Sequence, residues 1–188
     1  RYLQGVFALQ LGLSLGLALL ALGLGEAALA ADAFNLSATL DHGHVWALAA
    51  ALLAFQLQDL QRRYYFVLEK SRAAAANDLL SYGGQVTLLG LFGLRGTLDV
   101  TTAFLSIAAT SFTAFLLGFI YARVRPALSE ARAVLRDGWR TGRDYLLAWQ
   151  FQWLGTQGVL LVGGGMLGTQ AAGAVRAAQN IVGPINIL

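Results

Sequence analysis

Long uncharged apolar stretches constrain this chain more than any other feature of its sequence. Residues 3–24, 101–121 and 145–166 contain no Asp, Glu, Lys or Arg. A helix needs about 20 mostly apolar residues to cross the hydrocarbon core of a bilayer. A helix on the surface of a soluble protein would instead carry a polar stripe facing water, which these stretches lack. They therefore predict helices that span a membrane.

Three further stretches extend this pattern. Residues 45–66 are apolar in their first half, residues 79–94 form a shorter uncharged run, and another apolar stretch starts near Ala171. Charged residues make up only 12% of the chain, against about 25% in soluble domains. The predicted fold class is therefore all-α, a polytopic membrane bundle of about six transmembrane helices. The chain has no cysteine, which excludes disulfides and thiolate metal sites.

Positive charge is concentrated in alternate connections between these stretches. Lys and Arg gather in 62–78 and 122–144, whereas 25–44 contains neither residue. Cytoplasmic loops of membrane proteins carry the excess of Lys and Arg. We therefore expect a multi-pass protein of the bacterial cytoplasmic membrane, with 62–78 and 122–144 in the cytoplasm and 25–44 outside.

The basic segment 122–144 also has an amphipathic pattern. Leu128, Ala131, Leu135 and Trp139 share one face of a helix, and arginines flank that face. Such a helix lies in the membrane interface, with its arginines near anionic headgroups. The segment is interpreted either as a linker between two halves of a transporter or as a surface-anchored loop helix.

Polar side chains within the spans are the candidates for function. Gln150, Trp153 and Gln157 share one face, and amides and indoles suit sugar hydroxyls and rings as well as they suit interhelical hydrogen bonds. Arg176 lies inside the last span, where an arginine is costly and indicates function. It is expected to bind a pyrophosphate or carboxylate, or else to extend outward to the interface.

Two arginines lie near the end of the stretch 45–66. Arg62 and Arg63 follow Asp59 by three and four residues, so ion pairs within one helix turn are expected. The two arginines are interpreted either as an interfacial anchor beside an aromatic belt or as a basic mouth that recruits a lipid-linked phosphate.

Nothing in the sequence indicates an enzyme or a cofactor. Asp41, His42 and His44 form the one cluster of metal-binding residue types, and it could hold a metal weakly. A polar start to the helix that follows is the favoured interpretation of the same three residues.

Several runs resemble a known family. QDLQRRYYF at 58–66 and DLLSYGGQ at 78–85 look like the region around the fourth and fifth helices of polysaccharide flippases. The runs 168–173, 176–180 and 183–186 look like the start of the second half of these proteins. The flippases belong to the multidrug/oligosaccharidyl-lipid/polysaccharide exporter superfamily.

The resemblance implies an internal fragment of a transporter with twelve or more helices in two bundles around a central cavity. Residues 1–121 would end the first bundle with four helices, 122–144 would link the bundles, and 145–188 would start the second. The implied substrate is a polyprenyl-pyrophosphate-linked oligosaccharide, moved outward by alternating access and coupled to Na⁺ or protons. The candidate substrate-binding residues are Arg62, Arg63, Gln85, Gln150, Trp153, Gln157, Arg176 and Asn180.

Two alternatives stay open. One is a multidrug or cation exporter of the same superfamily, and the other is a membrane-embedded glycosyltransferase or ligase that uses Asp41, His42 and His44. The expected partners are membrane lipid, the lipid-linked oligosaccharide and anionic headgroups at the basic linker. Nucleic acid is not expected, and the oligomeric state is left open.

Overall fold

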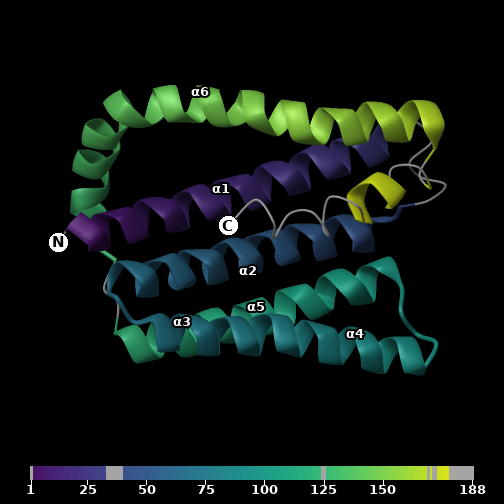
Figure 1. Ribbon diagram of the computed structural model, residues 1–188, viewed down its shortest axis with the longest axis horizontal. Coiled ribbons are helices and arrows are strands. Elements are labelled where there is room, and N and C mark those ends of the chain that lie inside the picture. The colour runs from purple at the N-terminus through teal and green to yellow at the C-terminus, as the bar shows by residue number, and fades with distance from the viewer. Residues whose placement is uncertain (1, 33–39, 124–125, 169, 171–172, 178–188) are drawn as a thin grey trace. The chain divides into compact units, whose positions relative to one another are not determined.

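The computed structural model describes residues 2–32, 40–123, 126–168, 170 and 173–177 of the chain. Within this part the prediction of an all-α protein is confirmed (Figure 1). The chain divides into two compact units, Arg1–Val134 and Leu135–Leu188, and each is described by itself. The helices are α1 (Tyr2–Ala30), α2 (His42–Val67), α3 (Ser71–Asp78), the π-helical turn η2 (Leu79–Gly83), α4 (Gly84–Leu94), α5 (Val100–Ala122) and α6 (Leu128–Leu167).

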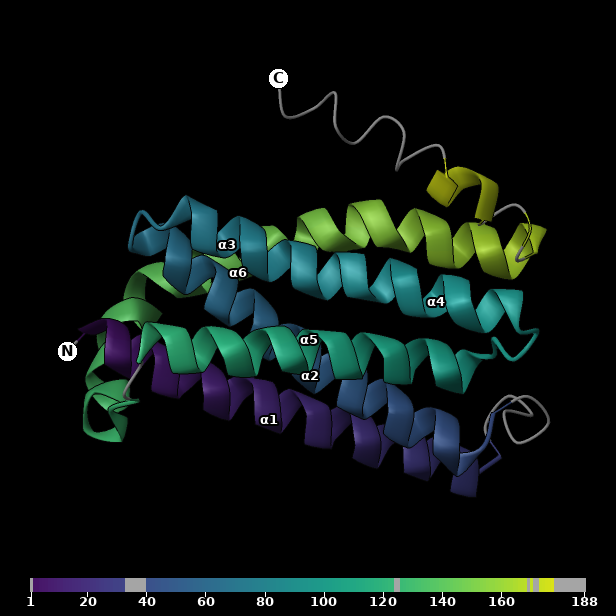
Figure 2. The same cartoon turned by 90° about the horizontal axis from the view of Figure 1, so that it is seen from below.

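The first unit is a bundle of antiparallel helices with α2 in its centre. Helix α2 packs against α1, α3 and α5, and α5 also packs against η2 and α4. Figure 2 shows α3 and α4 as one rod that runs beside α5. The rod contains the π turn η2, and turns of this kind are often found at functional sites.

Among the described residues, two helices, α1 and α5, are long and apolar enough to cross a membrane. The hydroxyl groups of Ser106, Thr110 and Thr113 in α5 donate to the carbonyl oxygens four residues earlier, at 2.7, 2.8 and 2.7 Å. These hydroxyls are therefore satisfied inside their own helix and need no water. The remaining four predicted spans, and with them the six-span bundle, stay a prediction.

Several predicted boundaries were wrong. Helix α1 continues to Ala30, so the first six residues of the predicted loop 25–44 are helical. The predicted connection 62–78 is mostly helical, since α2 ends at Val67 and α3 begins at Ser71. The helix predicted within segment 122–144 is present, but it is continuous with the predicted span 145–166, because α6 runs from Leu128 to Leu167; the role of the segment as a linker stays a prediction. Helices extend into polar sequence wherever the helical hydrogen-bond pattern can continue, so charge alone does not mark their ends.

The core of the first unit joins α1, α2 and α5. Phe7 is 1% exposed and packs edge-to-face against Tyr64, with the ring centroids 5.9 Å apart. Its ring also lies 6.1 Å from that of Phe119. Gly118 allows α5 to approach α2 closely, because a Cβ there would lie 2.7 Å from the Cγ of Gln61. The buried apolar cluster consists of Phe7, Leu57, Leu60 and Phe115.

Contacts between helix ends define two ends of this unit. At the first end, the Tyr65 and Tyr121 ring centroids lie 6.3 Å apart and join the last turns of α2 and α5. At the second end, His42 Nδ1 lies 2.6 Å from Glu26 Oε2 and joins the start of α2 to α1. Among the described Lys and Arg residues of the unit, Arg95 alone belongs to the second end. The first end holds Arg62, Arg63, Lys70, Arg72, Arg123 and Arg132.

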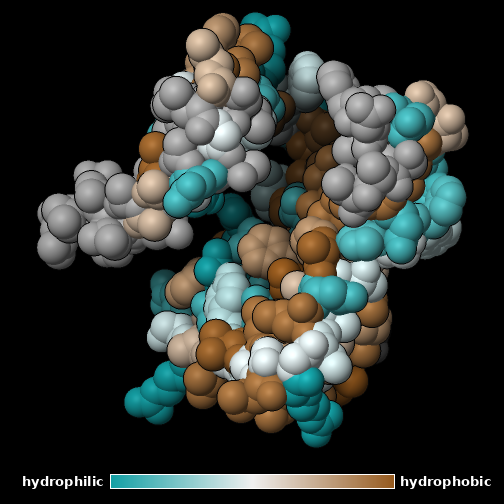
Figure 3. Space-filling model, turned by 90° about the vertical axis from the view of Figure 1, so that its right-hand side faces the viewer, coloured by the Kyte–Doolittle hydropathy of each residue, from teal (hydrophilic) through white to brown (hydrophobic). Residues whose placement is uncertain are grey.

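The outer surface of the helices is rich in exposed apolar side chains. Leu13 in α1 is 57% exposed, Val86 in α4 is 73% exposed and Leu94 at its end is 89% exposed. Figure 3 views the molecule from the side where α4 leads into α5, and brown, hydrophobic residues make up much of the surface in the lower part of the picture. Exposed apolar surface of this extent marks contact with lipid or with other protein.

Both helices that start at the second end are capped by an aspartate. The Asp41 carboxylate accepts a hydrogen bond of 2.9 Å from the backbone N–H of His44, and Asp99 accepts one of 2.6 Å from that of Thr102. The backbone hydrogen bond from His44 lowers the pKa of Asp41 below its ordinary 3.8. Hydrogen bonds from Thr102, first from its side chain and then from its backbone, lower the pKa of Asp99 in the same way.

These caps predict a loss of stability in acid. A carboxyl whose pKa is lower in the folded state stabilises the fold above its unfolded pKa and loses that contribution as pH falls through its folded pKa. We expect the melting temperature to fall as pH drops below 3.8. Asparagine also caps helices but does not titrate, so the double variant Asp41→Asn, Asp99→Asn should lose part of this pH dependence. Melting curves at several pH values measure it, and identical curves for both proteins would contradict the assignment.

Candidate functional site

Charged side chains in the second half of α2 form the centre of a polar network. Asp59 lies 2.7 Å from Arg62 Nη2 and 2.7 Å from Arg63 Nε, so one carboxylate binds two arginines. The predicted pairing within one helix turn is therefore confirmed. The Asp59 side chain is 19% exposed and that of Arg62 is 31% exposed, whereas that of Arg63 is 74% exposed.

The network crosses from α2 to the end of α3. Gln58 is fully buried, and its Nε2 donates to Asp78 Oδ1 at 3.0 Å. The other oxygen of Asp78 lies 3.8 Å from Arg62 Nη1. Arg62 is thus shared between Asp59 on its own helix and Asp78 on the neighbouring helix. Because the two arginines balance the two aspartates, this network carries no net charge.

A second polar cluster lies beyond the first, where η2 faces α5. The hydroxyl groups of Ser81 and Ser111 lie 3.2 Å apart, and both residues are fully buried. Gln85 Nε2 donates to each hydroxyl at 3.3 Å. The predicted binding residue Gln85 therefore joins two helices through hydrogen bonds.

The hypothesis of a basic mouth at Arg62 and Arg63 stays a prediction. Both arginines pair with Asp59, and Arg62 also lies near Asp78, so a lipid-linked phosphate would have to compete with carboxylates for them. The aromatic belt also stays a prediction, but Tyr65 of the run QRRYYF is 2% exposed and its hydroxyl donates to Gly118 O at 3.0 Å. Its position on the inner face of α2 turns this tyrosine toward α5 rather than toward an interface.

The second unit contains the other predicted site residues. Arg176 Nη1 donates to Gln157 Oε1 at 3.5 Å, a long hydrogen bond that brings two of the candidates together. Gln150 and Trp153 lie on α6 and are exposed. Asn180 lies outside the described residues, as does Pro184.

The cluster at the start of α2 has a structural role. Asp41 and His44 form a reciprocal capping box, in which the Asp41 backbone N–H donates to His44 Nδ1 at 3.3 Å. His42 pairs with Glu26 instead of with Asp41. The interpretation as a polar helix start is confirmed by these contacts.

Some residues of the network could not be found by sequence reasoning. Asp78 and Gln58 lie in the two runs that resemble the flippases, but nothing in the runs shows that these side chains meet. Ser111 lies in an apolar helix among other small residues and gives no signal. Only a pattern that places polar residues on the facing sides of two neighbouring helices would have indicated that these side chains meet.

Comparisons of the chain with protein-family models, with curated proteins and with solved structures found no match. The likeness to polysaccharide flippases therefore rests on the sequence runs quoted above.

Proposed function

We propose that this chain is part of a membrane transporter that flips polyprenyl-pyrophosphate-linked oligosaccharide across the bacterial cytoplasmic membrane for polysaccharide synthesis. The observation that carries the proposal is the network of Gln58, Asp59, Arg62 and Asp78, which joins α2 to α3 in a largely apolar bundle. Ionisable groups within membrane helices are costly and indicate transport pathways or proton relays. The sequence resemblance supplies the substrate class.

The proposed topology has six spans, with the basic end of the first unit in the cytoplasm. The connection between α2 and α3 at 68–70, with the helix ends beside it, and segment 122–144 face the cytoplasm, whereas 25–44 faces outside. The gathering of Lys and Arg at one end of the unit supports this orientation, because cytoplasmic segments carry the positive charge. The first half of α6 then lies along the inner membrane surface, where its arginines contact anionic headgroups.

Alternating access is the proposed mechanism, and Arg62 is the proposed gate. Arg62 contacts Asp59 at 2.7 Å and Asp78 at 3.8 Å, so a small shift between α2 and α3 would exchange its main partner. A sodium ion or proton that competes for either carboxylate would couple the exchange to an ion gradient. Within the second unit, Gln150, Trp153 and Gln157 are proposed to contact the sugar, and Arg176 the pyrophosphate. No covalent chemistry is required.

Replacing the gate tests the proposal. In cells that depend on this protein for polymer export, Arg62→Gln should lower the export rate by about ten-fold or more, because a charge-assisted hydrogen bond is worth roughly 1.5–3 kcal/mol. Membrane abundance should stay unchanged, since Gln can still donate to Asp59. Arg95→Gln at the opposite end is the matched control and should export normally. Normal export by Arg62→Gln at equal abundance would exclude a transport role for the network.

A cation or multidrug exporter is the second candidate, and the two partly buried carboxylates Asp59 and Asp78 favour it. Such exporters bind cations through acidic residues in the membrane. The same variants measured for efflux of a cationic dye separate the two candidates. Loss of dye efflux with normal polymer export would replace the flippase proposal by the exporter.

A further inference from the structure

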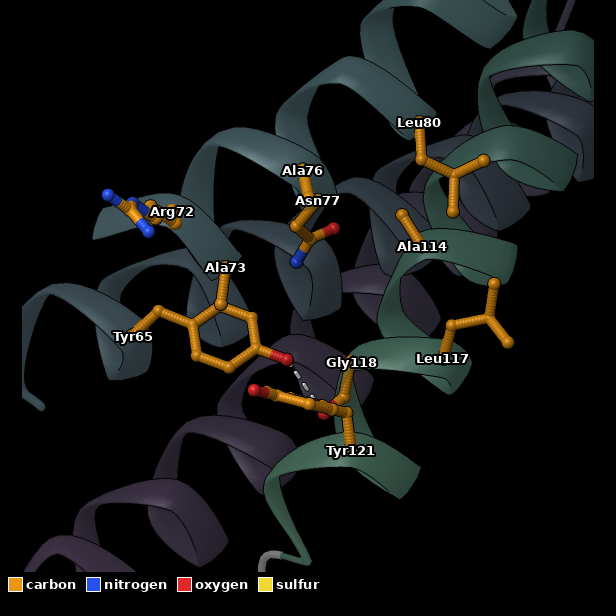
Figure 4. A pocket seen from close by; sticks show the side chains of 10 residues that line it. All are labelled: Tyr65, Arg72, Ala73, Ala76, Asn77, Leu80, Ala114, Leu117, Gly118 and Tyr121. Atoms are coloured by element: carbon orange, nitrogen blue, oxygen red, sulfur yellow. Dashed lines mark hydrogen bonds between the residues drawn. The ribbon is translucent and has the colours of Figure 1, made fainter. Parts of the chain in front are cut away.

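A pocket lies where the end of α2 and the start of α3 meet the last turns of α5 (Figure 4). Its volume is about 390 Å³, within the range of about 300–1,000 Å³ that is usual for ligand sites. It lies beside the polar network and shares none of the network's charged residues. Small and apolar side chains make most of its wall, namely Ala73, Ala76, Leu80, Ala114 and Leu117.

Two cations stand at the rim of this pocket. Arg72 lines the pocket and is exposed, and Lys70 Nζ lies 5.8 Å from the centroid of the Tyr121 ring, which also lines it. Within the described part of the chain neither cation forms an ion pair with an acid, in contrast to Arg62 and Arg63. The rim therefore offers positive charge that no acidic group among the described residues neutralises.

The third feature of the pocket is a buried amide. Asn77 is 6% exposed, and neither its Nδ2 nor its Oδ1 has a hydrogen-bond partner among the described residues. Figure 4 shows this side chain pointing into the middle of the pocket. A buried polar group without a partner is unfavourable, so the amide favours a ligand that brings a polar atom to it.

We propose that this pocket binds one anionic phospholipid of the surrounding membrane. The phosphate lies between Arg72 and Lys70, an ester carbonyl accepts a hydrogen bond from Asn77 Nδ2, and an acyl chain follows the apolar wall. Arg72 and Asn77 are separated by about 7.5 Å along the helix, which places the charged contact and the carbonyl contact at different depths, as in a phospholipid. The inference rests on the membrane setting of the proposed function and not on the transported substrate.

Lipid titrations of the full protein test the pocket. The detergent-purified, delipidated protein is titrated with dioleoyl phosphatidylglycerol and with dioleoyl phosphatidylcholine, which share their acyl chains and differ in net charge, and binding is counted by native mass spectrometry. The anionic lipid should bind about five-fold more tightly or better, the effect of one or more basic residues near a phosphate. Arg72→Gln should lower the affinity for phosphatidylglycerol by about five-fold and that for phosphatidylcholine by less, so that the preference for the anionic lipid shrinks. Arg95→Gln, the matched control, should change neither value.

A second variant separates lipid binding from a structural role. Asn77→Leu removes the unpartnered amide, so the melting temperature of the lipid-free protein should stay the same or rise. Affinity for both lipids should fall by about five-fold because the carbonyl contact is lost. Stability and lipid affinity then move in opposite directions, which a merely structural asparagine would not produce.

Four outcomes would overturn the inference: equal binding of the two lipids, unchanged binding by Arg72→Gln, displacement of phosphatidylglycerol by inorganic phosphate alone, or displacement by a polyprenyl phosphate at lower concentration. The last outcome would assign the pocket to the transported lipid. Because export and lipid binding are measured separately, failure of one assay does not decide the other. If Arg62→Gln loses export but the protein binds phosphatidylglycerol and phosphatidylcholine equally, the proposed function stands and only the lipid site is contradicted.

Discussion

Phe7→Ala should lower the free energy of unfolding by about 3–5 kcal/mol, the usual cost of removing a large buried aromatic side chain. Phe7 is 1% exposed and belongs to the cluster that joins α1 to α2 and α5. Its removal takes away the edge-to-face contact with Tyr64 and the contact with Phe119. The cavity cannot close easily, because three helices would have to move together to fill it.

Unfolding by SDS in mixed micelles, followed by tryptophan fluorescence, measures this loss. Leu19→Ala is the matched control on the same helix, since Leu19 is 59% exposed. It should change stability by less than about 0.5 kcal/mol. If both variants lose the same stability, α1 does not pack on α2 and α5 through the face that carries Phe7.

Asp59→Ala should lower the free energy of unfolding by about 1.5–3 kcal/mol and should stop export. The change leaves Arg62, whose side chain is 31% exposed, with Asp78 at 3.8 Å as its remaining acidic neighbour. Breaking a partly buried pair from one side leaves an uncompensated charge, which costs more than the pair itself contributes. Arg63→Gln is the control for stability and should cost about 0–1 kcal/mol, because its partner contact is at the surface.

A double variant separates stability from transport. Replacing both Asp59 and Arg62 by leucine removes the charges together, and apolar replacement of a buried pair is often neutral or stabilising. We expect the double variant to recover most of the stability lost in Asp59→Ala while export stays lost. Recovery of export together with stability would mean that the pair serves only to hold α2 in place.

The polar network and the lipid pocket give the first end of the unit two separate tasks. Arg62 and Arg63 pair with Asp59, the first partly buried and the second at the surface, whereas no acid among the described residues pairs with Lys70 or Arg72. If the proposals hold, local contacts divide the positive charge of this end between a gate and a lipid anchor. The short connection between Val67 and Ser71 keeps the two groups of cations only a few residues apart.

The sequence predicted part of this site for clear physical reasons. The spacing of Asp59, Arg62 and Arg63 brings them together on any α-helix, so their ion pairs follow from helical geometry alone. The cap at the start of α5 was not predicted, although it too is local, because Asp99 and Thr102 lie three residues apart in the chain. Asp78, Ser111 and Asn77 could not be assigned in this way, since their roles depend on helices that are distant in sequence.

Hydropathy and charge by themselves determined that the chain is helical, where its apolar helices lie and which connections are basic, because these follow from residue type and the 3.6-residue repeat. Hydropathy and charge did not predict where α1 ends, where α3 begins or that α6 is one continuous helix. Helix ends depend on local hydrogen bonding more than on hydropathy. Only the tertiary structure decided that Arg62 also meets Asp78 and that, among the described residues, no acid pairs with Lys70 or Arg72. That distinction arises from the approach of α3 and α5 to α2, which brings Asp78 to Arg62 and leaves Asn77 facing a pocket.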